Sequence, residues 1–212
     1  ETGAGSEGGA DAVAPTGVEA GTGLADAAAS YGRFLLLPAI AYPHKRHADL
    51  IEALAVLRRR HHEISLVLTG GPGPKDAAID GRVRRLGLEP VVHRLGRVPE
   101  DELDALYRSA AALVFPSAYE GFGNPVLEAM IRGCPVVASD GGALPEVGAE
   151  AVLTTPVGDV EAIVAAVERL LTEPGLAAKM AAAGRSRAAD FSAPAAGERL
   201  LDCYRRALAG YP

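Results

Sequence analysis

The stretch Glu120-Gly-Phe-Gly-Asn-Pro-Val-Leu-Glu128 decides the fold that we expect for this chain. The apolar run Ala111 to Pro116 precedes it, and an apolar segment with helical spacing follows it. A strand that leads through a glycine turn into a helix N-terminus is a ready-made anion site, because free backbone N–H groups and the helix dipole favour negative charge there. The stretch therefore predicts a ligand-binding turn between a strand and a helix.

The alternation of short apolar runs and helical periodicity continues on both sides of this turn. It predicts strands at Phe34–Leu37, Ile64–Leu68, Val91–Leu95, Leu113–Phe115, Pro135–Ala138 and Ala151–Thr154. It predicts helices at Ala48–Arg60, Ala77–Leu86, Pro99–Ala110, Asp159–Leu171, Pro174–Asp190 and Ala195–Ala209. Asp159 is expected to cap the helix that it begins. Such alternation is typical of an α/β fold with a Rossmann-like, doubly wound parallel sheet, here of about six strands. Ligands of such sheets bind at the carboxyl ends of the strands.

The composition divides the chain into two parts. Residues 1–30 are mostly Gly, Ala, Ser, Thr and acidic residues, with almost no large apolar side chain. Such a segment buries too little surface to offset the entropy of ordering, so we expect a disordered tail or linker there. Residues 31–212 have the composition of one globular domain. At about 180 residues, this domain is large enough for a substantial core.

Charge and cysteine content argue against several classes of function. The net charge of −6 disfavours nucleic acid as the main partner. Cys134 and Cys203 are the only cysteines, and their spacing is not that of metal ligands, which favours a reduced, cytoplasmic chain. No apolar run approaches the ~18 residues that are needed to span a bilayer.

Within the turn, the residue types have physical roles of their own. Gly121 and Gly123 leave the backbone open to the close approach of a ligand. Asn124 is expected to cap the helix with its side chain, and Pro125 suits the first helical position. Glu128 then lies about one turn inside the helix and leans back toward its N-terminus, within reach of a pair of sugar hydroxyls. The ordinary alternative is a capped helix with a salt-bridged glutamate.

In this strand–turn–helix setting, the stretch resembles the E-x7-E signature of the family 4 glycosyltransferases. These are retaining, nucleotide-sugar-dependent enzymes of the GT-B fold. The resemblance covers roughly residues 33–209, which correspond to the C-terminal, donor-binding domain. It implies that Glu128 binds the ribose hydroxyls of the donor and that Glu120 faces the transferred sugar. It assigns the remaining donor contacts of the turn to Gly121, Phe122 and Gly123. We expect Asn124, the next residue, to belong to the nucleotide-sugar site as well.

Lys45 lies in the loop Tyr42 to His47, between the first predicted strand and the first predicted helix. A leaving diphosphate needs positive charge, and a lysine on such a loop supplies it. By resemblance, Lys45 binds the diphosphate and joins Glu120 as a catalytic residue. Many family members carry an Arg five residues before this lysine, where this chain has Ile40. Either another basic group, such as the neighbouring Arg46, substitutes for it, or the phosphate site is weaker.

Two further loops are expected to contribute to the donor site. The resemblance implies that backbone groups around Val98, in the Leu-Gly-Arg-Val turn, hold the nucleobase. Gly71 lies in a glycine-rich loop that either approaches the donor or only turns the chain. Backbone contacts leave no trace in side chains, so the base stays open and a UDP- or GDP-sugar is the expected donor. No metal is required by the implied reaction.

Three other functions compete with this interpretation. A glycoside hydrolase also uses two carboxylates, about 5 to 9.5 Å apart, but it needs neither the anion-binding turn nor Lys45. A non-catalytic module that binds a nucleotide sugar or a partner protein fits the same residues. An unrelated Rossmann-like nucleotide enzyme is disfavoured, because no G-x-G-x-x-G follows the first strand and no G-K-[ST] loop exists.

The histidines do not predict a metal site. His44 and His47, and also His61 and His62, lack the cysteine or carboxylate partners that would complete a ligand set. Histidines at the ends of helices are commonly solvated, and we expect the same here.

A GT-B enzyme has two Rossmann-like domains, and the resemblance covers one of them. It implies an N-terminal, acceptor-binding domain supplied in cis or in trans, without which this chain is expected to be inactive. The helices after Pro174 would partly cross onto that domain and expose apolar surface to it. We therefore expect the chain to be a fragment of a longer enzyme, half of a split enzyme or a free donor-binding module. Contact with a membrane, if any, is expected to be peripheral and through the second domain.

Overall fold

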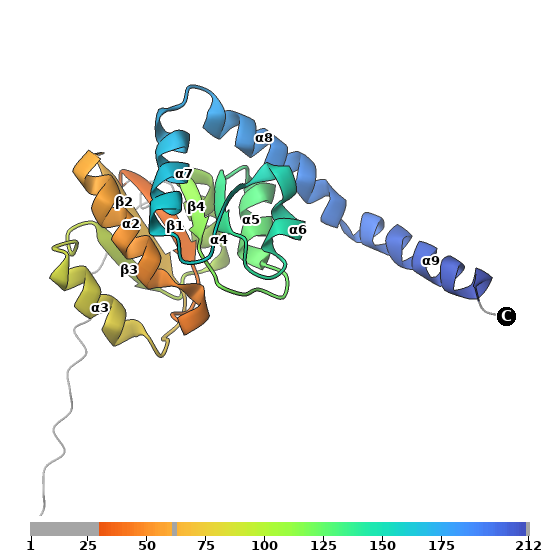
Figure 1. Cartoon of the computed structure of the whole chain (residues 1–212), viewed down its shortest axis with the longest axis horizontal. Helices are drawn as coiled ribbons and strands as arrows, with labels where there is room; N and C mark the ends of the chain where they lie inside the picture. Colours follow the sequence, from red (N-terminus) through yellow and green to blue (C-terminus); the bar gives the residue numbers. More distant parts are fainter. Residues whose placement is uncertain (1–29, 61–62, 211–212) are drawn as a thin grey trace, which may run out of the picture.

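The computed structural model describes residues 30–60 and 63–210, which form one six-stranded parallel sheet with helices around it. The strand order is β3-β2-β1-β4-β5-β6. From β1 at the centre of the sheet the chain winds outward through β2 to β3 and returns to the centre at β4 (Figure 1). It then winds outward through β5 to β6. This is a doubly wound, Rossmann-like sheet, so the predicted fold class is confirmed. The strands are β1 Arg33–Pro38, β2 Ile64–Thr69, β3 Val92–Gly96, β4 Ala112–Phe115, β5 Val136–Ser139 and β6 Leu153–Thr155.

The central strands are continuous apolar runs because both of their faces are covered. The side chains of Phe34 to Leu37 in β1 are completely buried, and every residue of β2 is buried. A parallel strand between two helical layers has no solvent face, so it does not alternate between apolar and polar residues. The edge strand β3 is only half-buried and carries His93 and Arg94.

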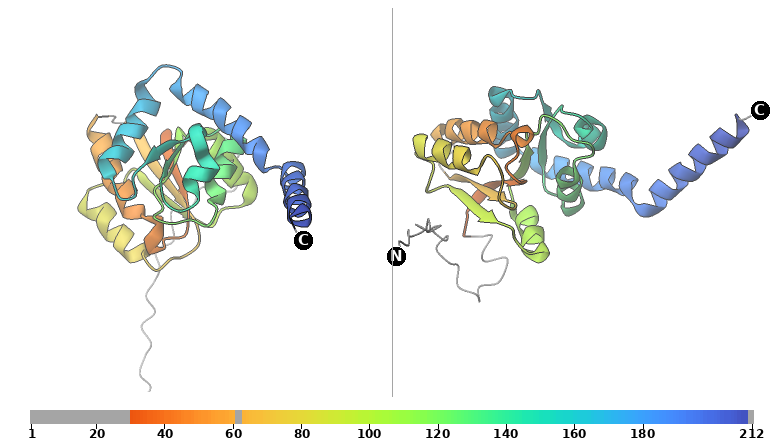
Figure 2. Two further views of the ribbon diagram at one scale, coloured as in Figure 1. Left: turned by 45° about the vertical axis from the view of Figure 1, so that its right-hand side comes forward. Right: turned by 90° about the horizontal axis from the view of Figure 1, so that it is seen from below.

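Helices cover the two faces of the sheet as two separate layers (Figure 2). On one face α2 packs against α3 and α7, and on the other α5 packs against α4 and α8. The α-helices are α2 His47–Arg60, α3 Asp76–Arg85, α4 Glu100–Ser109, α5 Asn124–Arg132, α6 Leu144–Gly148, α7 Val160–Thr172, α8 Leu176–Ala188 and α9 Ala193–Ala209.

The predicted boundaries of the strands and helices agree with the structure to within two residues, and the start of the sixth strand is one of the larger differences. It was expected to begin at Ala151, but residues Ala149–Ala151 form a short 3-10 helix and the strand begins at Leu153. Ala149 has a positive φ of 45°, which breaks the extended run that the sequence suggests. The predicted cap of α7 is confirmed, since the Asp159 carboxylate accepts from the backbone N–H of Ala162 at 2.9 Å. The predicted tail at 1–30 lies outside the described residues, except for Ser30.

The last helix, α9, extends away from the body of the domain (Figures 1 and 2). It has no buried residue, and four large apolar side chains are more than half exposed: Leu200, Leu201, Tyr204 and Leu208. Its sequence nevertheless shows a helical apolar stripe, and Ser192 caps its first turn by accepting from the Ala195 N–H. In the part of the chain that the structure describes, no helix has the length and apolar character needed to cross a membrane.

Candidate functional site

The loops that follow β1 and β4 meet where the winding direction of the sheet reverses. The two strands are neighbours and pair in parallel. The backbone N–H of Ala118 donates to the carbonyl of His44 at 2.6 Å, and the Ser117 hydroxyl donates to the same carbonyl at 3.1 Å. These bonds join two loops that lie far apart in the sequence. The carboxyl ends of the strands at this point are where doubly wound sheets bind their ligands.

Lys45 and Glu120, the two expected catalytic residues, form an ion pair across these loops. Lys45 Nζ lies 2.5 Å from Glu120 Oε1, and the two side chains are only 17% and 12% exposed. The ammonium group also lies 5.1 Å from the centre of the Phe115 ring, at the end of β4. Lys45 ends the 3-10 helix Pro43–Lys45, which fixes its backbone just before α2. The fold therefore places a mostly buried cation at the switch point.

The turn between Glu120 and α5 depends on Gly123. This residue has φ 94° and is the N-cap of α5, and a Cβ there would lie 2.5 Å from Leu144 Cδ2. The conformation therefore favours glycine, and a side chain there would also displace the end of the Leu144 side chain. The predicted cap by Asn124 is wrong, because Asn124 is already the first helical residue and no side chain caps the helix. Pro125 follows within the first turn, where its missing N–H costs little.

The other turn residues differ in how closely they are packed. A Cβ on Gly121 would meet open space, so the turn backbone is accessible there. The Phe122 ring packs edge-to-face on Phe191, with ring centres 5.6 Å apart and planes at 85°. Phe191 lies between α8 and α9 and also carries the Arg187 guanidinium 4.7 Å above its ring. The segment between α8 and α9 therefore packs against the turn from the outside.

Gly141 and Gly142 support the turn from β5 and were not among the predicted site residues. A Cβ on Gly141 would clash with the carbonyl of Ser117, and one on Gly142 with the backbone of Glu120. The next residue, Ala143, donates its N–H to the Glu120 carbonyl at 2.9 Å. The signal in the sequence was the pair of adjacent glycines directly after a predicted strand.

A cavity of about 430 Å³ brings together four of the predicted nucleotide-sugar-binding residues. These are Gly71 after β2, Val98 after β3, and Asn124 and Glu128 on α5. Lys45, Glu120 and the turn residues 121–123 do not line this cavity, but the same turn leads directly into α5. The predicted residues therefore fall into two neighbouring groups, one around the Lys45 ion pair and one around Glu128.

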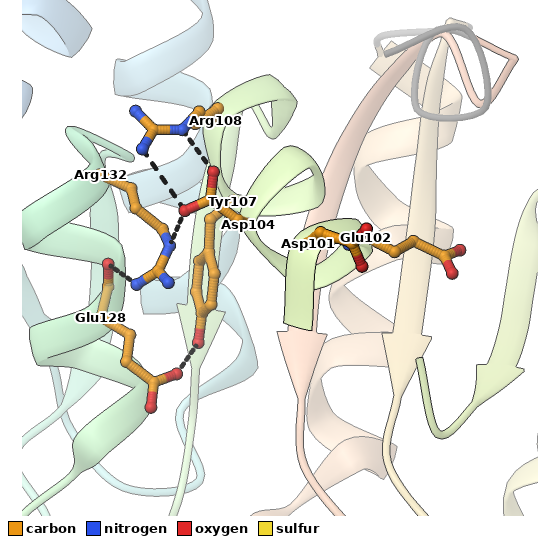
Figure 3. Close-up of polar contacts among 7 residues, drawn as sticks. All are labelled: Asp101, Glu102, Asp104, Tyr107, Arg108, Glu128 and Arg132. Atoms are coloured by element: carbon orange, nitrogen blue, oxygen red, sulfur yellow. Dashed lines mark hydrogen bonds and ion pairs between the residues drawn. The ribbon is translucent and has the colours of Figure 1, made fainter. Parts of the chain in front are cut away.

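Glu128 is anchored by a residue that the sequence analysis missed. The Tyr107 hydroxyl donates to Glu128 Oε2 at 2.8 Å (Figure 3). Tyr107 is fully buried on α4, and burial, followed by the charge of Glu128, raises its pKa far above the ordinary value. The hydroxyl therefore keeps its proton and remains a donor. Its signal was a tyrosine on the buried face of a predicted helix, because a buried Tyr O–H needs an acceptor.

Arg97 is a second residue that the sequence did not single out. It lies in the same cavity as Ile40, the residue that stands where many family members have an arginine. Both line the cavity of Glu128, in which Arg97 is the one cationic side chain and Glu128 the one anionic side chain among the described lining residues. A Cβ on Gly71 would lie 2.9 Å from Arg97 Nε, so the arginine lies along the Gly71 backbone. The suggestion that Arg46 replaces the missing arginine stays a prediction. Arg46 Nε lies 2.5 Å from Asp49 Oδ2, and Arg46 does not line this cavity.

The histidines are structural or exposed. His47 is buried, and its Nε2 lies 3.1 Å from the Ala39 carbonyl, so the expectation of a solvated His47 is wrong. Burial lowers its pKa, which keeps the ring neutral. His44 is exposed and stacks on Tyr42. His61 and His62 lie outside the described residues. Over residues 30–60 and 63–210, no group of three or more His, Cys, Asp or Glu side chains is placed to hold a metal ion.

Comparison with known proteins places this geometry in a family. Residues 30–187 match the family model described as "Glycosyl transferases group 1". The chain is 37% identical over 184 residues to an MMP alpha-(1->4)-mannosyltransferase of Mycolicibacterium hassiacum, covering 84% of this chain and 44% of that protein. The chain thus spans less than half the length of this relative.

Two solved structures show the same fold. The C-terminal domain of a glycosyl transferase group 1 family protein, LpcC from Francisella tularensis, has a TM-score of 0.65 and 25% identity. The alignment covers 73% of this chain and 82% of that domain. Anabaena HepE, in complex with UDP and glucose, has a TM-score of 0.75 at 21% identity and covers 86% of this chain and 52% of HepE. The chain therefore belongs to the group 1 glycosyltransferases, family 4, and has the fold of the C-terminal domain of their GT-B enzymes.

Proposed function

We propose that this chain binds the nucleotide part of a nucleotide diphosphate sugar and presents the sugar for retaining transfer to a hydroxyl acceptor. The observation that carries the proposal is the placement of the Lys45–Glu120 ion pair and the Glu128 cavity on either side of one glycine turn. A nucleotide diphosphate sugar has its ribose at one end of the diphosphate and its sugar at the other. The two groups of residues match those two ends.

The cavity of Glu128 suits the nucleoside. The Glu128 carboxylate accepts the ribose hydroxyls, and the backbone around Val98 and Gly71 contacts the base. This assignment is supported by the residues that line the cavity, since Glu128 is its one acid among the described residues. Asn124, at the start of α5, lies between the nucleoside and the diphosphate.

The diphosphate is placed at the N-terminus of α5, against the backbone of Gly121, Phe122 and Gly123. A helix N-terminus favours negative charge, and the Lys45 ammonium adds to it. During transfer, the bond between the anomeric carbon and the phosphate oxygen breaks and negative charge grows on the phosphate. Lys45 stabilises that charge, and Glu120 faces the hydroxyls of the sugar. Retention requires the acceptor hydroxyl to attack from the face that the phosphate leaves, and the departing phosphate takes its proton.

The acceptor site belongs, in this proposal, to an N-terminal domain in cis or in trans. The exposed apolar side chains of α9, such as Leu201 and Tyr204, suit contact with such a domain. The donor is proposed to be a UDP- or GDP-sugar, since the HepE structure contains UDP and the M. hassiacum relative is a mannosyltransferase. No metal is assigned a role. We place the chain in the cytoplasm, with any membrane contact made by the other domain.

A non-catalytic nucleotide-sugar-binding module is the second candidate. It fits the same cavity, and transfer by the two domains together distinguishes it from an enzyme. The hydrolase alternative is disfavoured, because the family is one of transferases.

The test is a calorimetric titration of the chain with UDP, GDP and ADP and with their common sugar conjugates. Saturable binding of one diphosphate is expected, with at least about a tenfold loss in Glu128→Gln, because each hydrogen bond to a charged group is worth about 1.5–3 kcal/mol. Glu102→Gln is the matched control, since its carboxylate lies on α4 and points away from Glu128 (Figure 3). Absence of binding, or equal losses in the two variants, would contradict the proposal.

A further inference from the structure

The Glu128 carboxylate has an unusual anchor for a partly exposed acid. Among the residues that the structure describes, Tyr107 is the one side chain that hydrogen-bonds it, with the hydroxyl 2.8 Å from Oε2. Figure 3 shows the other oxygen on the side away from Tyr107. A neutral donor fixes the orientation of a carboxylate without cancelling its charge, whereas an arginine or lysine partner would do both.

Arg132 is a nearby cation, but it binds Asp104 and the backbone carbonyl of Glu128 and not the Glu128 carboxylate. It lies one turn after Glu128 on α5, and its Nε is 2.7 Å from Asp104 Oδ1. Its Nη1 donates to the backbone carbonyl of Glu128 at 3.2 Å, not to the carboxylate. Asp104 also pairs with Arg108 at 2.6 Å, so α4 holds the arginine in place (Figure 3).

The same arginine holds the tyrosine. The Arg132 guanidinium carbon lies 5.2 Å from the centre of the Tyr107 ring, which is within the range of a cation–π contact. Tyr107 is completely buried, so its ring has no freedom to turn away from Glu128. Burial and the charge of Glu128 raise the pKa of Tyr107, so the hydroxyl is a donor at any working pH. The hydrogen bond from Tyr107 to Glu128 is therefore stabilised by the contact of Arg132 with the ring and by the burial of the tyrosine.

We propose that Tyr107 is a positioning residue for Glu128: its hydroxyl holds one carboxylate oxygen so that the other receives the ribose hydroxyls of the donor. Arg132 and Asp104 hold the tyrosine and keep the guanidinium off the carboxylate. The inference rests on the proposed function, because it needs Glu128 to bind the ribose. It extends the donor site from the E-x7-E turn to α4.

The test compares a diphosphate nucleotide with its 2′,3′-dideoxy form, on the parent chain and on Tyr107→Phe. The nucleotide is whichever of UDP, GDP and ADP binds the parent. Tyr107→Phe is expected to weaken binding of the ribonucleotide about fivefold, the effect of losing one hydrogen bond of about 1 kcal/mol, and to change binding of the dideoxy form less than about twofold. A role in stability alone would weaken both ligands equally.

Two controls make the result specific. Tyr31→Phe removes the same atom from a tyrosine before β1, at the opposite end of the strands, and is expected to change neither affinity. In a Glu128→Gln background, Tyr107→Phe is expected to have no further effect on the ribonucleotide. Should Tyr107→Phe fail to fold, Arg132→Lys is the second variant. It keeps the charge but loses the planar contact with the ring, and a smaller ribose-specific loss is expected.

The outcomes separate the two proposals. A parent chain that binds no nucleotide, or binds the ribonucleotide and dideoxy forms equally, overturns the proposed ribose site and this inference with it. A parent chain that prefers the ribonucleotide while Tyr107→Phe keeps the full preference overturns the positioning role alone.

Discussion

Glu120 and Glu128 lie in the same short stretch of sequence, yet the fold gives their carboxylates opposite kinds of partner. Glu120 faces the ammonium group of Lys45 at 2.5 Å, and both side chains are mostly buried. Glu128 accepts a hydrogen bond from the neutral hydroxyl of Tyr107 at 2.8 Å. The first carboxylate is neutralised by its partner, whereas the second keeps its charge.

The difference indicates that the two carboxylates at the ends of this turn have different roles in ligand binding. Positive charge at Lys45 is available to a diphosphate only if the ligand competes with Glu120 for it. Glu128 has no cation to give up, so it can accept hydroxyl groups without disrupting an ion pair. The two carboxylates are therefore expected to respond in different ways when their partners are removed.

Removing Lys45 is expected to have the largest effect on this comparison. Lys45→Ala leaves Glu120 unpaired at 12% exposure, so the free energy of unfolding should fall by about 1–3 kcal/mol. Affinity for the nucleoside diphosphate should fall about tenfold, because a charge-assisted contact of about 1.5 kcal/mol is lost. Urea denaturation and calorimetry measure the two effects. Lys179→Ala, an exposed lysine on α8, is the control, and equal effects in both variants would refute the assignment.

Neutralising Glu120 is expected to have a smaller effect of the opposite sign. Glu120→Gln releases the Lys45 ammonium from its ion pair, so the nucleoside diphosphate alone should bind about threefold more tightly, a gain below 1 kcal/mol. The sugar conjugate should gain less, since Glu120 is proposed to face the sugar. Weaker binding of the diphosphate to this variant would show that Glu120 contacts the nucleotide itself.

Arg97 is a test of the site around Glu128. There the cation lines the cavity together with Glu128 and is not its hydrogen-bond partner. Arg97→Ala should weaken nucleotide binding about two- to threefold, because an exposed cation contributes about 0.5 kcal/mol through a phosphate or the face of a base. Calorimetry measures it against Arg169→Ala, an exposed arginine that pairs with Glu173 and does not line the cavity. An unchanged affinity in Arg97→Ala would remove Arg97 from the site.

The smallest expected effect is a dependence of stability on pH, which comes from two partly or fully buried histidines. It sets the pH range in which the variants above can be compared. Burial lowers the pKa of His47 and His93 below 6.5, so below that pH the unfolded chain binds more protons than the folded chain. The stabilising contribution is complete above pH 6.5 and is lost as the pH falls toward the folded-state pKa. Melting temperatures measured between about pH 5.5 and 7.5 should fall on the acid side, and less so in His47→Gln. A melting temperature that rises with acid would contradict this.

Much of the fold was predictable because it depends on local patterns. The buried apolar runs of β1 and β2 and the cap at Asp159 follow from periodicity and from short-range hydrogen bonding. The start of β6 was mispredicted because Ala149 adopts a left-handed backbone that no local signal requires. The cap at Asn124 was mispredicted because Gly123 takes that position in contact with Leu144 from another element.

By itself, the sequence determined the doubly wound sheet, the family resemblance and the residue types of the turn from Glu120 to Glu128. These depend on neighbours along the chain and on periodicity, which a sequence states directly. Only the tertiary structure decided the partners of the two carboxylates, since Lys45 and Tyr107 reach them from a different loop and a different helix. It also decided that Arg97, rather than Arg46, lines the cavity of Glu128. The physical reason is that charge and hydrogen bonding act between atoms that are close in space, and the packing of the helices on the sheet sets those distances.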